Sequence, residues 1–115
     1  MNNIDLIKKL LSELEMELKV LKLWASERPT LNALTSQQPF CCDTLRFEQW
    51  LQFIFIPKIS EMIAVNASLP STISLCPMAE ESYKTLGTQA AKLINVIGDI
   101  DEVLSGRRYQ TLFVK

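Results

Sequence analysis

A regular series of apolar residues predicts a long amphipathic helix at the start of the chain. Its members follow one another at spacings of three and four residues, the heptad pattern of a helix that packs along one side. The residues of this series are Ile4, Ile7, Leu11, Leu14, Leu18, Leu21 and Ala25. A second apolar line that includes Leu10 and Trp24 widens the stripe, which favours a bundle over a two-stranded coil. We expect the helix to end before Pro29, because the residue preceding a proline is pushed out of the helical conformation.

The next stretch, from Pro29 to Asp43, carries no helical period and predicts a long loop. Loops longer than about 12–15 residues are uncommon in compact domains unless they are ordered or functional. Leu31, Leu34 and Phe40 supply apolar side chains that could hold this loop against the protein. We therefore expect an ordered loop between the first and second helices.

A second helix is predicted from Asp43 or Thr44, whose side-chain oxygens can cap its first turn, to about Val65. Residues 50–56 are apolar at every position except Gln52. An apolar surface on all sides indicates a helix that its neighbours cover on most faces. We therefore expect this helix to be central in the fold.

Pro57 lies inside the second helix. A proline lacks the N–H that would bond to the carbonyl four residues earlier, and its ring crowds that carbonyl. Apolar residues nevertheless continue at helical spacing through Ile59, Met62 and Ile63. We predict one continuous helix that is kinked at the proline.

Two further patterns predict a third and a fourth helix. The third begins near Pro77 and runs to about Leu86, and Gly87 can end it. The fourth ends at Gly106, and the acidic cluster at 99–102 is expected to form a solvated face of it. Apolar residues of the fourth helix recur at alternating spacings of four and three, namely Leu86, Ala90, Leu93, Ile97, Ile100 and Leu104.

These patterns predict an all-α fold, an antiparallel (up-and-down) four-helix bundle with a long ordered loop between helices 1 and 2. The chain has 115 residues, of which 48% are hydrophobic and only three are glycine, which disfavours a turn-rich β-fold. We expect residues 1–106 to form a single helical-bundle domain and residues 107–115 a C-terminal tail.

Charge and residue usage narrow the classes of function. Twelve basic and thirteen acidic residues leave a formal net charge of −1, so no global positive charge is available to bind a nucleic-acid backbone. The chain has no histidine, the commonest general base and metal ligand, and we expect neither a metal nor another cofactor. Three cysteines without a disulfide spacing, no secretory signal and no membrane span predict a cytoplasmic protein with reduced thiols.

Two segments carry a resemblance to a known family. Residues 36–44, with the sequence SQQPFCCDT, and residues 49–58, with QWLQFIFIPK, resemble the YqcC-like family of small bacterial proteins. The resemblance implies a small helical bundle, and the family label ties such proteins to tRNA pseudouridine synthase C by association. The chain departs from the family pattern at Gln49, where an acidic residue is expected, and at Phe53, where a tryptophan is expected.

The leading hypothesis is a non-enzymatic binding or accessory module, in a tRNA-modification context, that binds a protein or ligand through a groove at residues 36–58. Proline, aromatic and amide side chains dominate this segment, whereas titratable ones are few. The residues predicted to form the groove are Pro39, Phe40, Asp43, Thr44, Trp50, Gln52, Phe53, Pro57 and Lys58. Core packing of Trp50 is the alternative interpretation, because aromatic residues on an all-apolar helix cannot all face solvent.

Two other classes of function remain open. In a tRNA- or nucleotide-binding helper of a modification enzyme, Trp50 would stack on a base, and Arg46, Lys58, Arg107 and Arg108 would contact phosphates. A small-molecule enzyme would use Asp43 or a cysteine, although no histidine is present to activate a thiol. We expect a protein partner, no membrane, no pseudouridine synthase activity from the isolated chain, and either a monomer or a homodimer.

Overall fold

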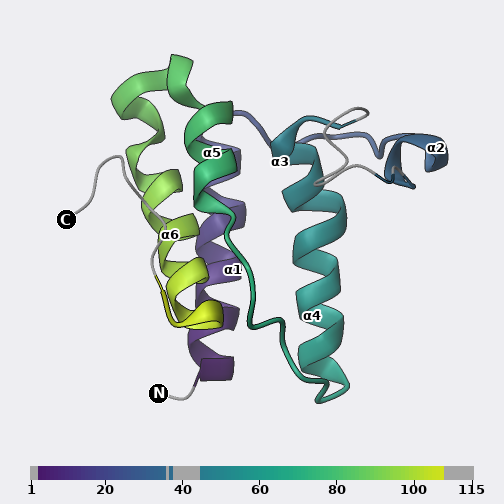
Figure 1. Ribbon diagram of the computed structural model, residues 1–115. Coiled ribbons are helices and arrows are strands. Elements are labelled where there is room, and N and C mark those ends of the chain that lie inside the picture. Colours follow the sequence, from purple (N-terminus) through teal and green to yellow (C-terminus); the bar gives the residue numbers. More distant parts are fainter. Residues whose placement is uncertain (1–2, 36, 38–44, 108–115) are drawn as a thin grey trace.

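Helices form all the regular structure in residues 3–35, 37 and 45–107, which are the residues that the computed structural model describes (Figure 1). Their bounds are α1 Asn3–Val20, α2 Leu31–Leu34, α3 Phe47–Trp50, the π-helical η2 Leu51–Phe55, α4 Ile56–Ala64, α5 Cys76–Ser82, the 3₁₀-helical η3 Lys84–Ala90 and α6 Ala91–Ser105. The all-helical prediction is confirmed for this part of the chain. The up-and-down order, the ordered loop and the domain bounds stay predictions.

The helices pack on two sides of α1. In Figure 1, α5 and α6 lie together on one side of α1, and α4 lies on the other. Helix α6 packs closely on both α1 and α5, whereas the backbones of α1 and α4 approach each other less closely. No helix in the described residues combines the length and the apolar character that a membrane crossing requires.

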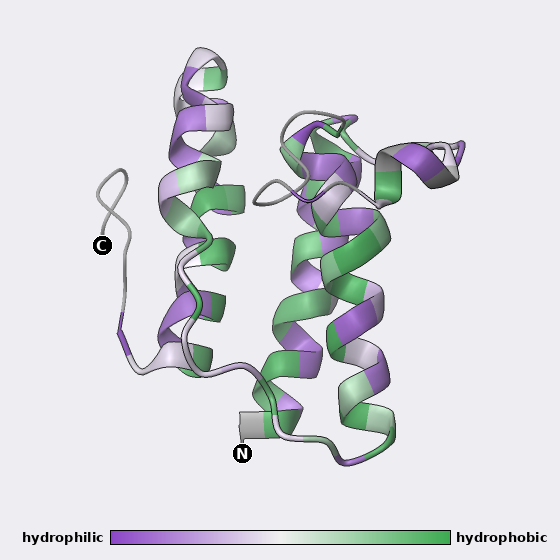
Figure 2. Cartoon of the chain, turned by 45° about the vertical axis from the view of Figure 1, so that its right-hand side comes forward, coloured by the Kyte–Doolittle hydropathy of each residue, from purple (hydrophilic) through white to green (hydrophobic). Residues whose placement is uncertain are grey.

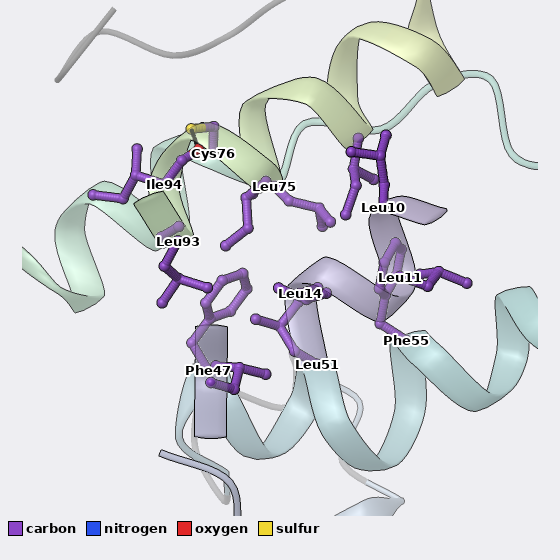
Figure 3. Close-up of a cluster of buried hydrophobic side chains, with 14 of the residues drawn as sticks. Leu10, Leu11, Leu14, Phe47, Leu51, Phe55, Leu75, Cys76, Leu93 and Ile94 are labelled. Atoms are coloured by element: carbon purple, nitrogen blue, oxygen red, sulfur yellow. Dashed lines mark hydrogen bonds between the residues drawn. The ribbon is translucent and has the colours of Figure 1, made fainter. Parts of the chain in front are cut away.

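A cluster of buried side chains joins these helices. Figure 2 shows hydrophobic and hydrophilic residues in alternating bands along each helix, as expected of amphipathic helices. Figure 3 shows apolar side chains from α1, from α3 and η2, and from α6 converging on one another. The buried residues that α1 contributes are those of the predicted seam and its neighbour, namely Ile7, Leu10, Leu11, Leu14 and Leu18.

The end of α1 differs from the prediction. The helix stops at Val20, before the apolar series ends at Ala25, because Lys22 adopts a left-handed backbone conformation with φ 61°. The N–H of Leu23 donates to the C=O of Leu18 at 2.8 Å, as in the Schellman motif that satisfies the last carbonyls of a helix. The predicted helical extension toward Pro29 is therefore wrong.

The second helix begins at Phe47, and Arg46 is the residue that precedes its first turn. The side-chain oxygen of Gln49 accepts a hydrogen bond from the backbone N–H of Arg46 at 2.9 Å. Glutamine and glutamate both serve at this third helical position, so Gln49 makes the contact that an acidic residue would make. The predicted start of this helix near Asp43 is wrong, because the helix starts at Phe47. Asp43 and Thr44, the predicted caps, lie outside the described residues.

One continuous helix runs from Phe47 through η2 to Ala64. In η2, the N–H of Ile56 donates to the C=O of Leu51, five residues earlier, instead of to the carbonyl four residues earlier. Pro57 follows directly, and the wider π-helical turn leaves room for its ring where a regular α-helix would clash. The predicted continuation of the helix through Pro57 is confirmed.

Asp101 connects α6 to the start of α5. Its side chain is fully buried, and its two carboxylate oxygens accept hydrogen bonds from the backbone N–H groups of Leu75 at 2.7 Å and Cys76 at 2.8 Å. The carboxylate thus satisfies N–H groups that the first turn of a helix leaves without a helical partner. The prediction of a solvated acidic face at 99–102 is wrong at this residue.

Candidate functional site

A concavity lies where α3 faces α5 and η3. We call it the Tyr83 cleft, and its volume is about 560 Å³. The residues that line it are Leu23, Leu45, Arg46, Phe47, Glu48, Met78, Ser82, Tyr83, Thr85 and Leu86. Volumes of about 300–1,000 Å³, with apolar walls and a few polar groups, are typical of ligand pockets.

Two of the lining side chains, Phe47 and Tyr83, belong to a cluster of four aromatic rings. The rings of Phe47 and Trp50 stack with their centroids 5.9 Å apart, and Trp50 also stacks on Phe55 at 5.5 Å. The ring of Tyr83 lies 6.2 Å from that of Phe47 in a tilted arrangement. Offset-stacked and tilted contacts of this kind are the arrangements that aromatic pairs prefer, so the rings support one another's orientation.

A charged and a neutral polar group meet inside the cleft. The hydroxyl of Tyr83 donates to Oε1 of Glu48 at 3.2 Å, which joins α5 to α3. Burial raises the pKa of Tyr83 well above its ordinary value, and the charge of Glu48 and this hydrogen bond raise it further. The phenol therefore stays protonated and acts as a hydrogen-bond donor to the carboxylate.

This raised pKa predicts a loss of stability in alkali. Below about pH 10 the phenol is neutral in both states, whereas above it the unfolded chain ionises while the folded chain resists, so stability falls as the pH rises. The slope should approach about 1.4 kcal/mol per pH unit. Urea unfolding of the wild-type protein and Tyr83→Phe, at about pH 9 and about pH 11, measures it.

Tyr83→Phe is expected to unfold more easily at the lower pH, because it lacks the hydrogen bond to Glu48, and to show a smaller further loss at the higher pH. Tyr109 is present in both proteins, so its ionisation cancels in the comparison. Equal losses in the two proteins between these pH values would contradict the prediction.

The predicted groove residues that the structure describes lie along one continuous helix, from the end of α3 through η2 to the start of α4. Trp50 is half-buried within the aromatic stack, and Gln52 is buried at 8% exposure. Phe53 is half-buried, with the guanidinium carbon of Arg28 6.0 Å from its ring centroid. Pro57 and Lys58 are exposed on α4. None of these residues lines the Tyr83 cleft.

Gln52 has a specific role in this arrangement. Its Oε1 accepts a hydrogen bond from the backbone N–H of Ala25 at 2.7 Å, and its Nε2 donates to the C=O of the same residue at 2.9 Å. This pair of bonds fixes the segment after α1 to η2. Leu23, which lines the cleft, belongs to that segment.

The predicted phosphate-binding residues are spread over the molecule. Arg46 is exposed and lines the Tyr83 cleft, whereas Lys58 lies further along the same helix by about 18 Å of helical rise. Arg107 follows the C-terminal end of α6, and Figure 1 shows that end of the helix at the opposite end of the molecule from α3. Pro39, Phe40, Asp43, Thr44 and Arg108, together with Cys41, Cys42 and residues 109–115, lie outside the described residues.

A smaller groove of about 320 Å³ separates α1 from α4. It is lined by Lys8, Leu11, Ser12, Glu15, Ile56, Ser60 and Ile63. No aromatic side chain lines this groove. Its polar residues lie where the apolar face of an amphipathic helix borders its polar face. Within the described residues, no three His, Cys, Asp or Glu side chains lie close enough to hold a metal ion.

The sequence prediction missed the half of the Tyr83 cleft that α5 and η3 supply. A signal for it was present, because Cys76, Ala79, Tyr83 and Leu86 follow one another at spacings of three, four and three. The first three of these side chains are buried and Leu86 is half-buried. This seam identifies the inner face of α5 but not the element that it faces.

Comparisons with known proteins place the chain among YqcC-like proteins. A sequence model of the family described as tRNA pseudouridine synthase C matches residues 6–103. The solution structure of YqcC from Escherichia coli is similar to this fold with a TM-score of 0.79 and 26% identity, and the match covers 91% of this chain and 90% of that one. The sequence of E. coli YqcC, an uncharacterised protein, is 26% identical over 105 residues, which are 91% of this chain and 96% of that protein.

Two further relatives differ in length. An uncharacterised protein of Haemophilus influenzae is 35% identical over 77 residues, which are 67% of this chain and 73% of that protein. A protein of Pectobacterium carotovorum named tRNA pseudouridine synthase C is 26% identical over 84 residues, which are 73% of this chain but only 22% of that protein. This last similarity is therefore confined to a small part of a much longer chain.

Proposed function

Because the chain belongs to the YqcC-like family, whose sequence model is described as tRNA pseudouridine synthase C, we propose that it is a non-enzymatic accessory module of tRNA modification. It binds a protein partner through the Tyr83 cleft. The observation that carries this proposal is the cleft itself, a concavity of about 560 Å³ lined by five apolar side chains and by five that carry a polar or charged group.

The composition of the cleft suits protein binding. Tyrosine, tryptophan and arginine are enriched among residues that dominate binding energy at interfaces, and methionine adapts to irregular partner surfaces. Arg46, Met78 and Tyr83 line the cleft, and Trp50 stacks on the lining residue Phe47. The start of α3 belongs to the 36–58 segment, where the sequence analysis placed the groove, and α5 and η3 complete the cleft.

The titratable groups of the cleft favour binding over catalysis. Tyr83 stays protonated because its pKa is raised, so it is a poor general base at neutral pH. The chain contains no histidine that could replace it. Binding and positioning of a partner do not require Tyr83 to lose its proton.

A tRNA pseudouridine synthase C is the first candidate partner. The Pectobacterium relative with that name resembles this chain over only 22% of its length. A segment of this size within a longer protein is what is expected of a module that works beside a larger catalytic part. In the present protein the same module would bind the synthase.

Isothermal titration calorimetry of the purified protein with the tRNA pseudouridine synthase C of the same organism tests this proposal. We expect saturable binding that Met78→Glu weakens by about tenfold or more, because the variant places a charge against the apolar wall of the cleft. Met16→Glu is the matched control, since Met16 is 63% exposed on α1 and does not line the cleft. Circular dichroism of both variants checks that the fold is retained.

Absence of binding to the synthase, or equal weakening by the two methionine variants, would contradict the proposal. Titration with tRNA at low ionic strength distinguishes the alternative function. The separated positions of Arg46, Lys58 and Arg107 predict weak and salt-sensitive association at most. Tight binding of tRNA without the synthase would instead favour a direct tRNA-binding role.

A further inference from the structure

We propose that the Tyr83 cleft recognises a segment of the partner protein in which an apolar side chain lies next to a lysine or arginine. Glu48 pairs with the basic residue and determines this specificity. The inference rests on the proposed function and goes beyond it, because it names the chemistry of the segment that is bound.

Glu48 supplies the negative charge inside the cleft. It is half-buried on α3, and one of its oxygens accepts the hydroxyl of Tyr83 at 3.2 Å. An ionised carboxylate has about four acceptor positions on its two oxygens. The tyrosine uses one of them and orients the group, which leaves capacity to accept N–H donors from a lysine or arginine of the partner.

The other charged group that lines the cleft is less favourably placed to set specificity. Arg46 is exposed, whereas Glu48 is half-buried. Exclusion of water by a bound segment strengthens a charge pair most where the pair is already partly desolvated. The carboxylate therefore discriminates between basic and acidic segments more strongly than the arginine does.

The apolar half of the cleft accommodates the anchoring side chain. Met78 and Leu86 are half-buried and line the cleft together with the ring of Phe47. Partly exposed apolar groups around an aromatic ring gain most when a partner side chain covers them. A leucine, methionine or phenylalanine next to the basic residue would fill this space.

Charge reversal at Glu48 tests the inference. With the tRNA pseudouridine synthase C of the same organism as titrant, Glu48→Lys is expected to bind about tenfold more weakly or worse, because like charges then meet in the cleft. Glu48→Gln keeps an acceptor for Tyr83 but removes the charge, and it is expected to bind several-fold more weakly. Glu61→Lys is the matched control, since Glu61 is exposed about 20 Å further along the same helix.

Overlapping peptides of the synthase then identify the bound segment. The segment expected to bind carries lysine or arginine beside a large apolar residue, and its lysine-to-glutamate version should bind Glu48→Lys better than the wild-type protein. If the wild-type protein binds the synthase but neither Glu48 variant weakens binding, or if the selected peptides are acidic, the inference is wrong and the proposed function stands. If the wild-type protein does not bind the synthase, the proposed function itself fails.

Discussion

Replacing Asp101 with alanine is expected to lower the free energy of unfolding by about 3–5 kcal/mol. The carboxylate accepts hydrogen bonds from two backbone N–H groups, of Leu75 at 2.7 Å and of Cys76 at 2.8 Å. All three residues are buried, so water cannot replace the lost acceptor. Each N–H left without an acceptor costs about 1–3 kcal/mol, and the favourable charge at the start of α5 is lost as well.

Urea denaturation followed by circular dichroism measures this loss. Asp101→Asn retains one acceptor oxygen and turns a donor toward the other N–H, so a loss of about 2 kcal/mol is expected. Glu102→Ala is the matched control, because Glu102 is the next residue of α6 and is exposed. Its effect should stay within about 0.5 kcal/mol. A wild-type midpoint in Asp101→Ala would show that the carboxylate does not hold α5 to α6.

The burial of Asp101 shows where the residue pattern was misinterpreted. The acidic cluster at 99–102 was predicted to be a solvated face, as most charge clusters on helices are. However, Asp101 follows Ile94 by seven residues and Ile97 by four, which places it within the buried stripe of α6. The spacing of apolar residues therefore predicts that position 101 is buried, whereas an acidic side chain is usually exposed. The hydrogen bonds that compensate for burying the carboxylate come from the start of α5, which is distant in sequence.

The central parts of the seams of α1 and α6 were predicted correctly because their signal is local. The ends were not, since Ile4 is exposed and Leu86 lies in η3, before α6 begins. Apolar residues at helical spacing bury the same face whatever they pack against, and Leu14, Leu18, Ile97 and Ile100 are all fully buried. The end of α1 was not predicted, since the apolar series continues past it to Ala25. Bonds from Gln52 to that residue hold the segment outside the helix, and such tertiary contacts override a local pattern.

The candidate site was harder to predict than the fold for the same reason. Its lining residues come from three stretches that are distant in sequence, around Leu23, Phe47 and Tyr83. The aromatic density of the 36–58 segment favours a groove there, and part of that segment does line the cleft. Pairing of Glu48 with Tyr83 spans 35 residues, and no spacing rule of a single helix relates the two.

Replacing Gln52 is expected to affect both stability and the shape of the cleft. Gln52→Leu keeps a similar volume but leaves the N–H and the C=O of Ala25 without their partners. The expected loss is about 2–3 kcal/mol, less than for Asp101→Ala because Ala25 is only half-buried and water can reach it in part. Gln89→Ala, at an exposed position of η3, is the matched control and should change stability little.

Gln52→Glu separates the hydrogen bonds from the packing. An ionised glutamate can still accept from the N–H of Ala25, but it turns an acceptor toward the C=O, whereas a protonated glutamate can donate to it. This contact and burial should raise the pKa of the introduced carboxyl, so the stability of the variant should recover as the pH falls. Urea midpoints that remain equally low in acid would contradict a role for these two bonds.

Because Leu23 lies in the segment that Gln52 holds, the Gln52→Glu variant should also bind the synthase more weakly at neutral pH, while Gln89→Ala should bind it like the wild-type protein.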